Sequence, residues 1–315
     1  MIPVWNGRRW LDDCLGSIAA QTLTPREVIA VDNGSRDGSV AHLRANYPQV
    51  RVLELGTNTG FAFAVNRGIE AANEELVALL NTDVVLEPDW LARMSGALVT
   101  DPGAGSVAGK MLELGDHTLV YDAGDVLRRD GVSEQRGRFC ADDGSWDRAG
   151  EVFGACAGAA IYRRDAVLAV GAFDERYFAY LEDVDLALAL RLAGWRCRYE
   201  PAVSRHVGEG SSHQLDGTHQ RLVARNTVLL VAKWFPARWL PWVLYRQAGW
   251  LWHAARERRL VVHLRGLAEG LILGARALPE RGRRSEESLA IESVVPRLPI
   301  RGPAAGGHQS RHARR

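Results

Sequence analysis

Short apolar runs alternate with helical stretches over the first 80 residues of the chain. The apolar runs are IPVW from residue 2, EVIAVDN from residue 27, VRVLEL from residue 50 and ELVALLN from residue 75. The stretches between them, at about residues 8–20, 39–47 and 60–72, have the composition of helices. Strands that alternate with helices of this length predict βαβ units and a mostly parallel sheet. The chain is therefore expected to be an α/β protein.

The same domain is expected to continue to about residue 215. The expected elements are an amphipathic helix at 88–100, a strand at 106–111 and hairpins over one sheet edge at 114–146. A run of small residues at 153–162 is expected to lead into a strand, and a strand at 196–201 and a short segment ending at His206 complete the domain. The hairpins are predicted because their segment is rich in Gly, Asp and Arg. The second half of the domain is thus less regular than the first.

A helical appendage is predicted at residues 216–279, followed by a basic, disordered tail at 280–315. Five of the ten tryptophans lie in this appendage, interleaved with Arg238, Arg246, Arg256 and Arg258. They are Trp234, Trp239, Trp242, Trp250 and Trp252. Tryptophans with flanking cations favour helices that lie in the headgroup region of a bilayer. The alternative is an appendage packed on the domain or on a second subunit. Its last helix, from Leu260, is expected to end at Pro279.

Composition narrows the functional classes. The 315 residues are 47% hydrophobic, which is ample for a core, and the formal net charge of +1 argues against nucleic-acid binding. The four cysteines lack CxxC spacing, so neither a zinc site nor a disulfide framework is expected, and a cytoplasmic location fits best. No signal peptide and no uncharged run of about 20 apolar residues is seen, so we expect no membrane span.

Polar residues follow three of the predicted strands. They are Asp32-Asn33-Gly34-Ser35 after the second strand, Asn58-Thr59-Gly60 after the third and Asn81-Thr82-Asp83 after the fourth. Ligands bind beyond the carboxyl ends of strands in such sheets. Ordinary turn chemistry explains Ser35 and Asn58 equally well. Asp83 is the stronger candidate, because the strand LVALL that delivers it is too apolar to lie at the surface.

Three carboxylates, Glu182, Asp183 and Asp185, stand at the start of an apolar helix. Like charges so close together raise one another's proton affinity, which suits a group that accepts a proton near neutral pH. The cluster is therefore a candidate for general-base chemistry. The alternative is a solvated helix start, where acids cap free N–H groups and favour the helix dipole.

Five motifs, in this order, resemble the family 2 glycosyltransferases, and most closely the bacterial rhamnosyltransferase-like branch. They are VDNGSRDGS from Val31, NTGFAFAVNRG from Asn58, LLNTDV from Leu79, GAFDERYFAYLEDVDL from Gly171 and SRHVGEGSS from Ser204. The resemblance covers about residues 2–235. It implies a GT-A fold, in which a Rossmann-like domain with flanking helices binds a nucleoside diphosphate sugar and the acceptor enters through the second half.

The resemblance also implies a role for each matched residue. Donor contacts fall on Pro3, Asp32, Asn33, Ser35, Asn58, Gly60, Phe61, Asn66, Asn81 and Asp83. Asp83 matches the metal-binding acid and His206 a further metal contact, which favours Mn²⁺ or Mg²⁺. Asp183 matches the base that deprotonates the acceptor hydroxyl, with Glu182 and Asp185 orienting it or binding the acceptor. Glu182 remains an alternative base.

Several positions depart from the family pattern. Asn81 stands where stricter DxD motifs have a carboxylate. Ala64-Val65-Asn66 replaces the Gly-Asn-Asn sequence of many relatives, so that Asn66 is the polar contact that remains. The QxxRW motif of processive members is missing, which favours one sugar per encounter. The chain begins later than is usual in the family, so the first strand is expected to be short.

The leading hypothesis is an inverting, metal-dependent hexosyltransferase of cell-envelope glycan synthesis. It is expected to move a sugar such as rhamnose to a lipid-linked or polysaccharide acceptor at the inner face of the plasma membrane. The alternative is a nucleotide-sugar-binding protein that lacks catalysis. A dinucleotide enzyme is disfavoured, because the first turn has only Asn6-Gly7 and not GxGxxG.

Overall fold

The first half of the domain is a parallel sheet, as the alternation of strands and helices predicts. A computed structural model describes residues 1–207 and 218–282. Strands β1 (Ile2–Val4), β2 (Ile29–Asp32) and β3 (Arg51–Glu54) pair in parallel. Helices α1 (Leu11–Ala19), α2 (Ser39–Asn46) and α3 (Phe61–Ala71) connect them to one another and to β4 (Leu76–Leu80). β4 lies beside β1, because the Leu80 N–H donates to the Met1 carbonyl at 3.1 Å.

The second half of the sheet is mixed. Strands β8 (Asp125–Leu127) and β9 (Ser133–Gln135) pair as a separate hairpin. Besides β4, the mixed sheet contains β5 (Val84–Leu86), β6 (Ala104–Glu113), β7 (Val120–Asp122), β10 (Gly150–Val152), β11 (Ala159–Arg163) and β12 (Arg196–His206). Its helices are α4 (Trp90–Thr100), α5 (Arg164–Ala169) and α6 (Glu182–Leu192), with a short 3₁₀ turn at Glu175–Tyr177. The strand order is β10-β12-β6-β11-β4. β12 pairs with β6 in parallel, whereas β11 runs antiparallel to both neighbours.

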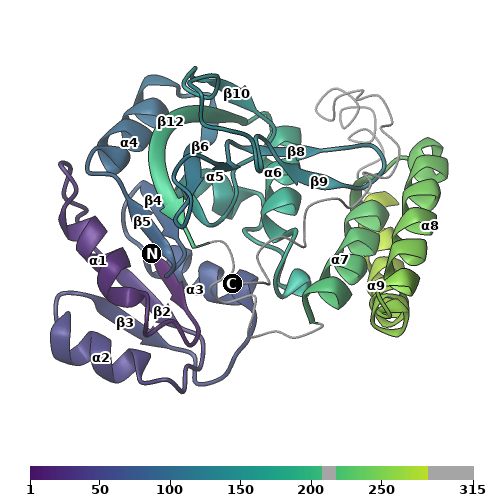
Figure 1. Cartoon of the computed structure of the whole chain (residues 1–315), viewed down its shortest axis with the longest axis horizontal. Coiled ribbons are helices and arrows are strands. Elements are labelled where there is room, and N and C mark those ends of the chain that lie inside the picture. The colour runs from purple at the N-terminus through teal and green to yellow at the C-terminus, as the bar shows by residue number, and fades with distance from the viewer. Residues whose placement is uncertain (208–217, 283–315) are drawn as a thin grey trace.

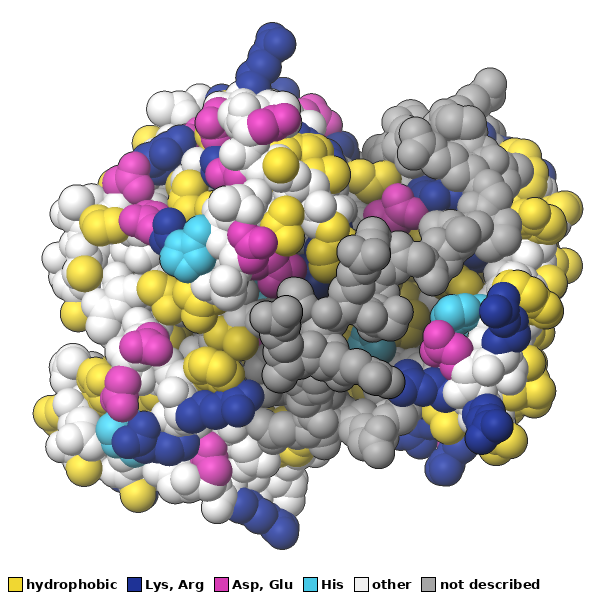
Figure 2. Space-filling model, viewed as in Figure 1, with side chains coloured by type: hydrophobic (Ala, Val, Ile, Leu, Met, Phe, Trp, Pro, Cys, Tyr) yellow, Lys and Arg dark blue, Asp and Glu magenta, His cyan; other side chains and the backbone are white. Residues whose placement is uncertain are grey.

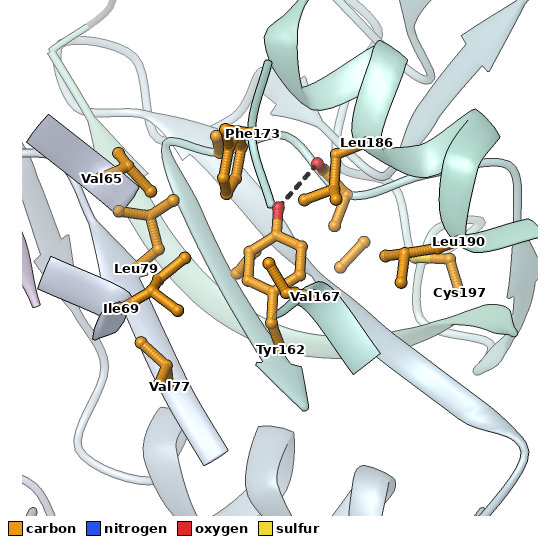
Figure 3. Packing of buried hydrophobic residues seen from close by; sticks show 14 of the residues in the cluster. Val65, Ile69, Val77, Leu79, Tyr162, Val167, Phe173, Leu186, Leu190 and Cys197 are labelled. Carbon is orange, nitrogen blue, oxygen red and sulfur yellow. Dashed lines mark hydrogen bonds between the residues drawn. The ribbon is translucent and has the colours of Figure 1, made fainter. Parts of the chain in front are cut away.

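Helices cover both faces of the sheet (Figure 1). Apolar residues of α3, α5 and α6 fill one side of the core, and those of α1, α2 and α4 fill the other. Figure 3 shows the first side, with Tyr162 of β11 between Ile69 of α3 and Leu186 of α6. The Tyr162 hydroxyl donates to the Ala155 carbonyl at 3.3 Å, which satisfies the one polar atom that this ring buries. The core therefore fixes the strand ends from both sides.

Three C-terminal helices extend the domain at one end of the molecule (Figure 1). They are α7 (Thr218–Trp234), α8 (Leu240–Arg256) and α9 (Leu260–Gly282). α7 shares a hydrophobic cluster with α6, so it is packed on the second half of the domain. α9 crosses α7 closely, since a Cβ atom at Gly270 would stand 2.6 Å from the Arg225 carbonyl oxygen. α9 does not end at Pro279 as expected but continues to Gly282, and the tail at 283–315 lies outside the described residues.

The structure corrects the interpretation of the tryptophans and arginines in the appendage. Trp234 and Trp239 are buried in the core rather than presented to a membrane. Arg246 is also buried, where it forms an ion pair with Asp130 at 2.8 Å. Composition alone could not show this, because the same residue types serve packing and lipid contact. Among residues 1–207 and 218–282, no helix is long and apolar enough to cross a bilayer.

Candidate functional site

A cleft of about 510 Å³ lies beyond the carboxyl ends of β1, β2 and β4. The start of α6, the end of β12 and the start of α7 also contribute to its walls. Nine of the residues predicted from the sequence line it: Pro3, Asn33, Asn58, Phe61, Asn81, Asp83, Glu182, Asp183 and His206. The fold thus brings Asp83 and Asp183, which are far apart in the sequence, to the same cleft.

Asn33 organises the loops on the β1–β4 side of this cleft. Its amide nitrogen donates to the Gly60 carbonyl at 3.0 Å and to the Asn58 side-chain oxygen at 3.2 Å. Its oxygen accepts hydrogen bonds from the Thr59 N–H and hydroxyl, both at 2.8 Å. One buried side chain therefore fixes the loop after β2 against the loop after β3. Such mutual hydrogen bonding holds the loops in place before any ligand binds.

Asp32, Ser35 and Gly60 do not line the cleft, and each shapes a turn beside it. The Asp32 carboxylate accepts the N–H groups of Gly34 at 3.1 Å and Ser35 at 3.2 Å. The Ser35 hydroxyl oxygen accepts the Asn6 N–H at 2.9 Å. Gly60 has φ +94°, and a Cβ atom there would stand 2.6 Å from the Phe178 ring. Turn chemistry, the alternative considered for Ser35, describes what these side chains do in this structure.

Asn66 is placed away from the cleft, which corrects its prediction as a donor contact. Its amide nitrogen donates to the Phe173 carbonyl at 2.8 Å, and its oxygen accepts the Phe173 N–H at 3.0 Å. The side chain is buried and its hydrogen-bonding groups are used in this exchange. Asn66 therefore ties α3 to the segment that precedes α6.

Asp83 and His206 form a pair at the end of β4 and β12. The Asp83 carboxylate oxygen lies 3.3 Å from Nε2 of His206, and both side chains are buried. The His206 ring packs against Tyr121 at a centroid distance of 4.5 Å. Within the described ranges, no group of three or more His, Cys, Asp or Glu side chains is arranged to hold a metal alone. One carboxylate and one imidazole suit Mn²⁺ or Mg²⁺ only if a bound diphosphate and water supply the remaining oxygens.

Asp183 and Glu182 begin α6 but differ in their hydrogen bonds. The Asp183 carboxylate accepts the Ala157 N–H at 3.1 Å and the Val184 N–H at 2.9 Å. Burial raises the pKa of Asp183, while these two donors favour its ionised form. Burial and the neighbouring Asp183 charge raise the pKa of Glu182 well above its usual range, and Oε2 of Glu182 is buried without a hydrogen-bond partner. Asp183 is therefore the first of the two to ionise.

Asp185 faces away from the cleft, which corrects its prediction as a residue that orients the base or binds the acceptor. Its carboxylate accepts hydrogen bonds from the Tyr177 hydroxyl at 3.0 Å and from Nε1 of Trp234 at 2.6 Å. Nζ of Lys233 lies 2.7 Å away and bridges to Asp174 at 2.6 Å. Every one of these groups is buried or half-buried. Asp185 anchors α7 to the start of α6.

α7 also holds the loop that precedes Glu182. Phe178, Tyr180 and Leu181 have φ values of +63°, +72° and +68°, which are unfavourable for side chains other than glycine. Asn226 of α7 donates to three carbonyls of this loop: Tyr177 at 3.0 Å, Ala179 at 2.8 Å and Tyr180 at 2.6 Å. The sequence analysis missed this role of Asn226. The only signal was a polar Arg-Asn pair within an otherwise apolar stretch of helix.

Two further acids, Asp122 and Asp125, were also missed. They flank the turn between β7 and β8 and are buried near Glu182 and Asp183. Burial, with the Asp183 charge, raises the pKa of Asp122 to about 7 and that of Asp125 well above its usual range. Their signal was the sequence YDAGDVL, in which two acids interrupt an apolar run. Asp125 lines the cleft, whereas Asp122 does not.

Comparison with known proteins agrees with this geometry. The model of the family described as glycosyl transferase family 2 matches residues 1–171. The N-acetylglucosaminyl-diphospho-decaprenol L-rhamnosyltransferase of Mycobacterium tuberculosis is 30% identical over 262 residues, covering 73% of this chain and 84% of that protein. The poly-beta-1,6-N-acetyl-D-glucosamine synthase of Staphylococcus aureus is 24% identical over 204 residues, 64% of this chain and 47% of that protein.

Solved structures confirm the fold expected from the sequence. GalNAc-T7 with UDP, GalNAc and Mn²⁺ matches with a TM-score of 0.60 at 15% identity, over 75% of this chain and 47% of that one. The mannosyltransferase of Pyrobaculum calidifontis with GDP-Man and Mn²⁺ matches with a TM-score of 0.53 at 20% identity, over 93% of this chain and 80% of that one. The architecture is that of the GT-A glycosyltransferases. With the family model covering more than half of its length, the chain belongs to glycosyl transferase family 2.

Proposed function

We propose that the protein is an inverting glycosyltransferase that moves one sugar, rhamnose, from a nucleoside diphosphate donor to a lipid-linked acceptor of cell-envelope glycan synthesis. The observation that carries this proposal is the convergence of Asp83 and Asp183 on one cleft of about 510 Å³. The choice of sugar and acceptor follows the mycobacterial relative, whose name specifies a rhamnosyltransferase and a diphospho-decaprenol acceptor. The family alone supports only the broader reaction class.

The donor is proposed to bind across the loops that Asn33 holds together. Pro3, Asn58 and Phe61 line this side of the cleft, next to Asn81. Asp83 and His206, 3.3 Å apart, would hold Mn²⁺ or Mg²⁺ together with the donor's phosphate oxygens. A bound divalent cation neutralises the negative charge that builds on the leaving diphosphate. Asn81 adds no charge, so metal affinity depends on Asp83.

Asp183 is proposed as the general base. Its ionised carboxylate accepts the proton of the acceptor hydroxyl, while that oxygen forms a bond to the anomeric carbon. The bond from this carbon to the diphosphate breaks, and its electron pair leaves with the nucleoside diphosphate. A single displacement from the opposite face inverts the anomeric centre. Asp183 is preferred to Glu182 as the base, because the N–H groups of Ala157 and Val184 favour its ionised form. Burial and the Asp183 charge raise the pKa of Glu182 well above its usual range.

The outer surface of the appendage supports peripheral contact with the inner face of the plasma membrane. Figure 2 shows hydrophobic side chains along the outer edge of the molecule at α8, with Lys and Arg side chains nearby. Trp252 is 62% exposed, and the Arg256 guanidinium lies over its ring at 4.7 Å. Exposed aromatic side chains with cations suit the headgroup region of an anionic bilayer. Such contact would bring a lipid-linked acceptor to the cleft.

A transfer assay tests the proposed function. Purified protein with Mn²⁺ is incubated with a panel of nucleotide sugars and a synthetic undecyl diphosphate that carries N-acetylglucosamine, and release of nucleoside diphosphate is followed. We expect turnover of a rhamnose donor, loss of turnover on chelation, and recovery with Mn²⁺. Asp83→Asn should need a much higher Mn²⁺ concentration. Calorimetric binding of a nucleotide sugar without any turnover would instead favour a binding protein without catalysis.

A further inference from the structure

The turn between β7 and β8 brings two buried acids to the catalytic end of the cleft. Asp122 ends β7 and is 2% exposed, and Asp125 begins β8 and is 5% exposed. Both are close enough to Asp183 for its charge to act on them. Neither residue belongs to the family motifs used above. The proposed mechanism also leaves them without a role.

Three carboxyl oxygens in this region have no hydrogen-bond partner among residues 1–207 and 218–282. They are Oδ1 of Asp122, Oδ2 of Asp125 and Oε2 of Glu182, each of them buried. A buried polar atom without a partner is unfavourable unless a ligand or water completes it. Asp125 is the one of the two hairpin acids that lines the cleft, so a ligand in the cleft can reach it.

The surroundings restrict the chemistry of that ligand. Among the described residues, no three His, Cys, Asp or Glu side chains are arranged to hold a metal ion. An anionic group would be repelled by the ionised Asp183, and an apolar group would leave the buried oxygens unpaired. Gln135, the cross-strand partner of Asp125, also lines the cleft, as does Ser133. A neutral ligand rich in hydroxyl groups meets all of these conditions.

We propose that Asp125 binds the acceptor sugar through a second hydroxyl, next to the hydroxyl that Asp183 deprotonates. This inference rests on the proposed function and adds the residue that selects the acceptor. It assigns the region around Asp125 to a neutral sugar ring, and it leaves the acceptor's diphosphate outside this acidic part of the cleft.

The electrostatic surroundings of Asp125 suit such a ligand. Burial, together with the charges of Asp183, Asp122 and Glu182, raises its pKa well above the usual range. A protonated carboxyl group both donates and accepts a hydrogen bond, as a sugar hydroxyl does. Asparagine offers the same pair of functions at nearly the same size, whereas alanine offers neither. The two substitutions therefore separate hydrogen bonding from mere burial.

The test compares Asp125→Ala with Asp125→Asn, and uses Asp122→Ala as the matched control from the same turn. Steady-state transfer is measured with the synthetic undecyl diphosphate carrying N-acetylglucosamine. We expect D125A to raise the acceptor KM about tenfold, the loss of one hydrogen bond, with the donor KM unchanged. D125N should stay within about threefold and D122A near the wild-type KM. An unchanged acceptor KM in D125A, or an equal rise in D122A, would overturn the proposal.

A second measurement compares each protein with itself on different acceptors, so partial loss of active D125A does not change its KM ratio. Wild-type protein is assayed with acceptors that each lack one ring hydroxyl. One of these deoxy acceptors should raise the wild-type KM about tenfold but cause no further rise in D125A. If every deoxy acceptor raised the KM by the same factor in wild type and in D125A, Asp125 would contact none of the ring hydroxyls.

Failure of the proposed function would look different. In that case wild-type protein transfers no sugar to this acceptor, and the site is tested by binding alone. Saturation-transfer NMR with the methyl glycoside of N-acetylglucosamine then compares wild type and D125A. Signal that is lost in D125A supports the site, and equal signal in the two proteins rejects it.

Discussion

The two sides of the cleft differ in how their polar groups are satisfied. On the donor side, Asn33 exchanges four hydrogen bonds with the loop at Asn58, Thr59 and Gly60. On the acceptor side, Asp125 and Glu182 each bury an oxygen that has no hydrogen-bond partner in the described part of the chain. The donor side is complete without a ligand, whereas the acceptor side is not.

Buried carboxyl oxygens without a partner are thus found on the acceptor side, where the proposed base lies. Preformed loops bind a nucleotide with little reorganisation, so they need no strained or unpaired groups. A base that works near neutral pH needs a raised pKa, and burial raises the pKa of Asp183. The acceptor side should therefore govern rate, pH dependence and acceptor binding, while the donor side should govern donor affinity.

The strongest test of this comparison is Asp183→Asn. We expect kcat to fall by about 10²- to 10⁴-fold, because the acceptor hydroxyl loses its base. Donor binding, measured by calorimetry, should stay within about twofold of wild type, since no donor-side loop contacts Asp183. A large loss of donor affinity in this variant would show that the acceptor side also governs donor binding.

Glu182→Gln is the matched control, because Glu182 is the neighbouring acid of the same helix turn. Burial and the neighbouring Asp183 charge raise its pKa well above the usual range. Gln keeps the size of this side chain and cannot accept a proton from the acceptor. We expect kcat within about tenfold of wild type, the cost of one altered hydrogen bond. A loss as large as that in D183N would identify Glu182 as the base instead.

The next largest effect is expected for Asn226→Ala. The change removes the donor that holds the carbonyls of Tyr177, Ala179 and Tyr180. The loop before α6 has unfavourable backbone angles, so it should relax and misplace Asp183. We expect kcat to fall about tenfold or more and the free energy of unfolding to drop by about 1–3 kcal/mol.

Thr227→Val provides the control for this prediction. The Thr227 hydroxyl donates only to the Val223 carbonyl within α7, at 2.8 Å, so the loop keeps all its contacts. Both variants are assayed well below their melting temperatures. A kcat for N226A equal to that of T227V would show that α7 supports the fold without positioning the base.

The sequence could predict the elements whose patterns are local. The βαβ order and the helix at 39–46 follow from alternating apolar runs, and Asp83 was identified because a buried strand delivers it. The approach of Asp83 to Asp183 was implied by the family resemblance. The structure confirms that the two residues line one cleft.

What the sequence could not predict depends on contacts between distant segments. Asp185 is an acid of the same helix start as Glu182 and Asp183. It lies two or three residues further along the helix, however, and therefore on another face, where it forms an ion pair with Lys233. Asp125 lies in a hairpin whose register with β9 no local pattern specifies. Arg246 reads as a surface cation until its ion pair with Asp130 is seen.

On the donor side, Asn33→Ala should act on affinity alone. Removing this amide frees the loop at Asn58 and Gly60 from the loop after β2. We expect the donor KM to rise about tenfold, with kcat and the acceptor KM little changed. The pH profile of kcat should also stay in place, because no acid of the acceptor side is touched. A shifted profile would show that the two sides are coupled.

The smallest effect is expected for Asp122→Asn, and it concerns stability. Burial, and then the Asp183 charge, raises the pKa of Asp122 from 3.8 to about 7, although Arg136 and Arg138 oppose this. Because the folded protein then binds more protons than the unfolded chain between these values, the free energy of unfolding falls as pH rises from about 4 to 7. Asparagine cannot ionise, so D122N should lose less stability over this range.

We therefore expect D122N to melt several degrees above wild type at pH 8, because burial there destabilises the ionised Asp122 carboxylate and not the Asn amide. At pH 4 the two proteins should melt together, because Asp122 is then protonated when folded and close to its midpoint when unfolded. Thermal unfolding followed by circular dichroism at several pH values measures both melting temperatures.

The same substitution made on the donor side, at Asp32, should destabilise the protein instead, since that carboxylate accepts the N–H groups of Gly34 and Ser35. If D122N and Asp32→Asn both stabilised or both destabilised the protein, the two sides would not differ in whether their buried carboxylates have hydrogen-bond partners.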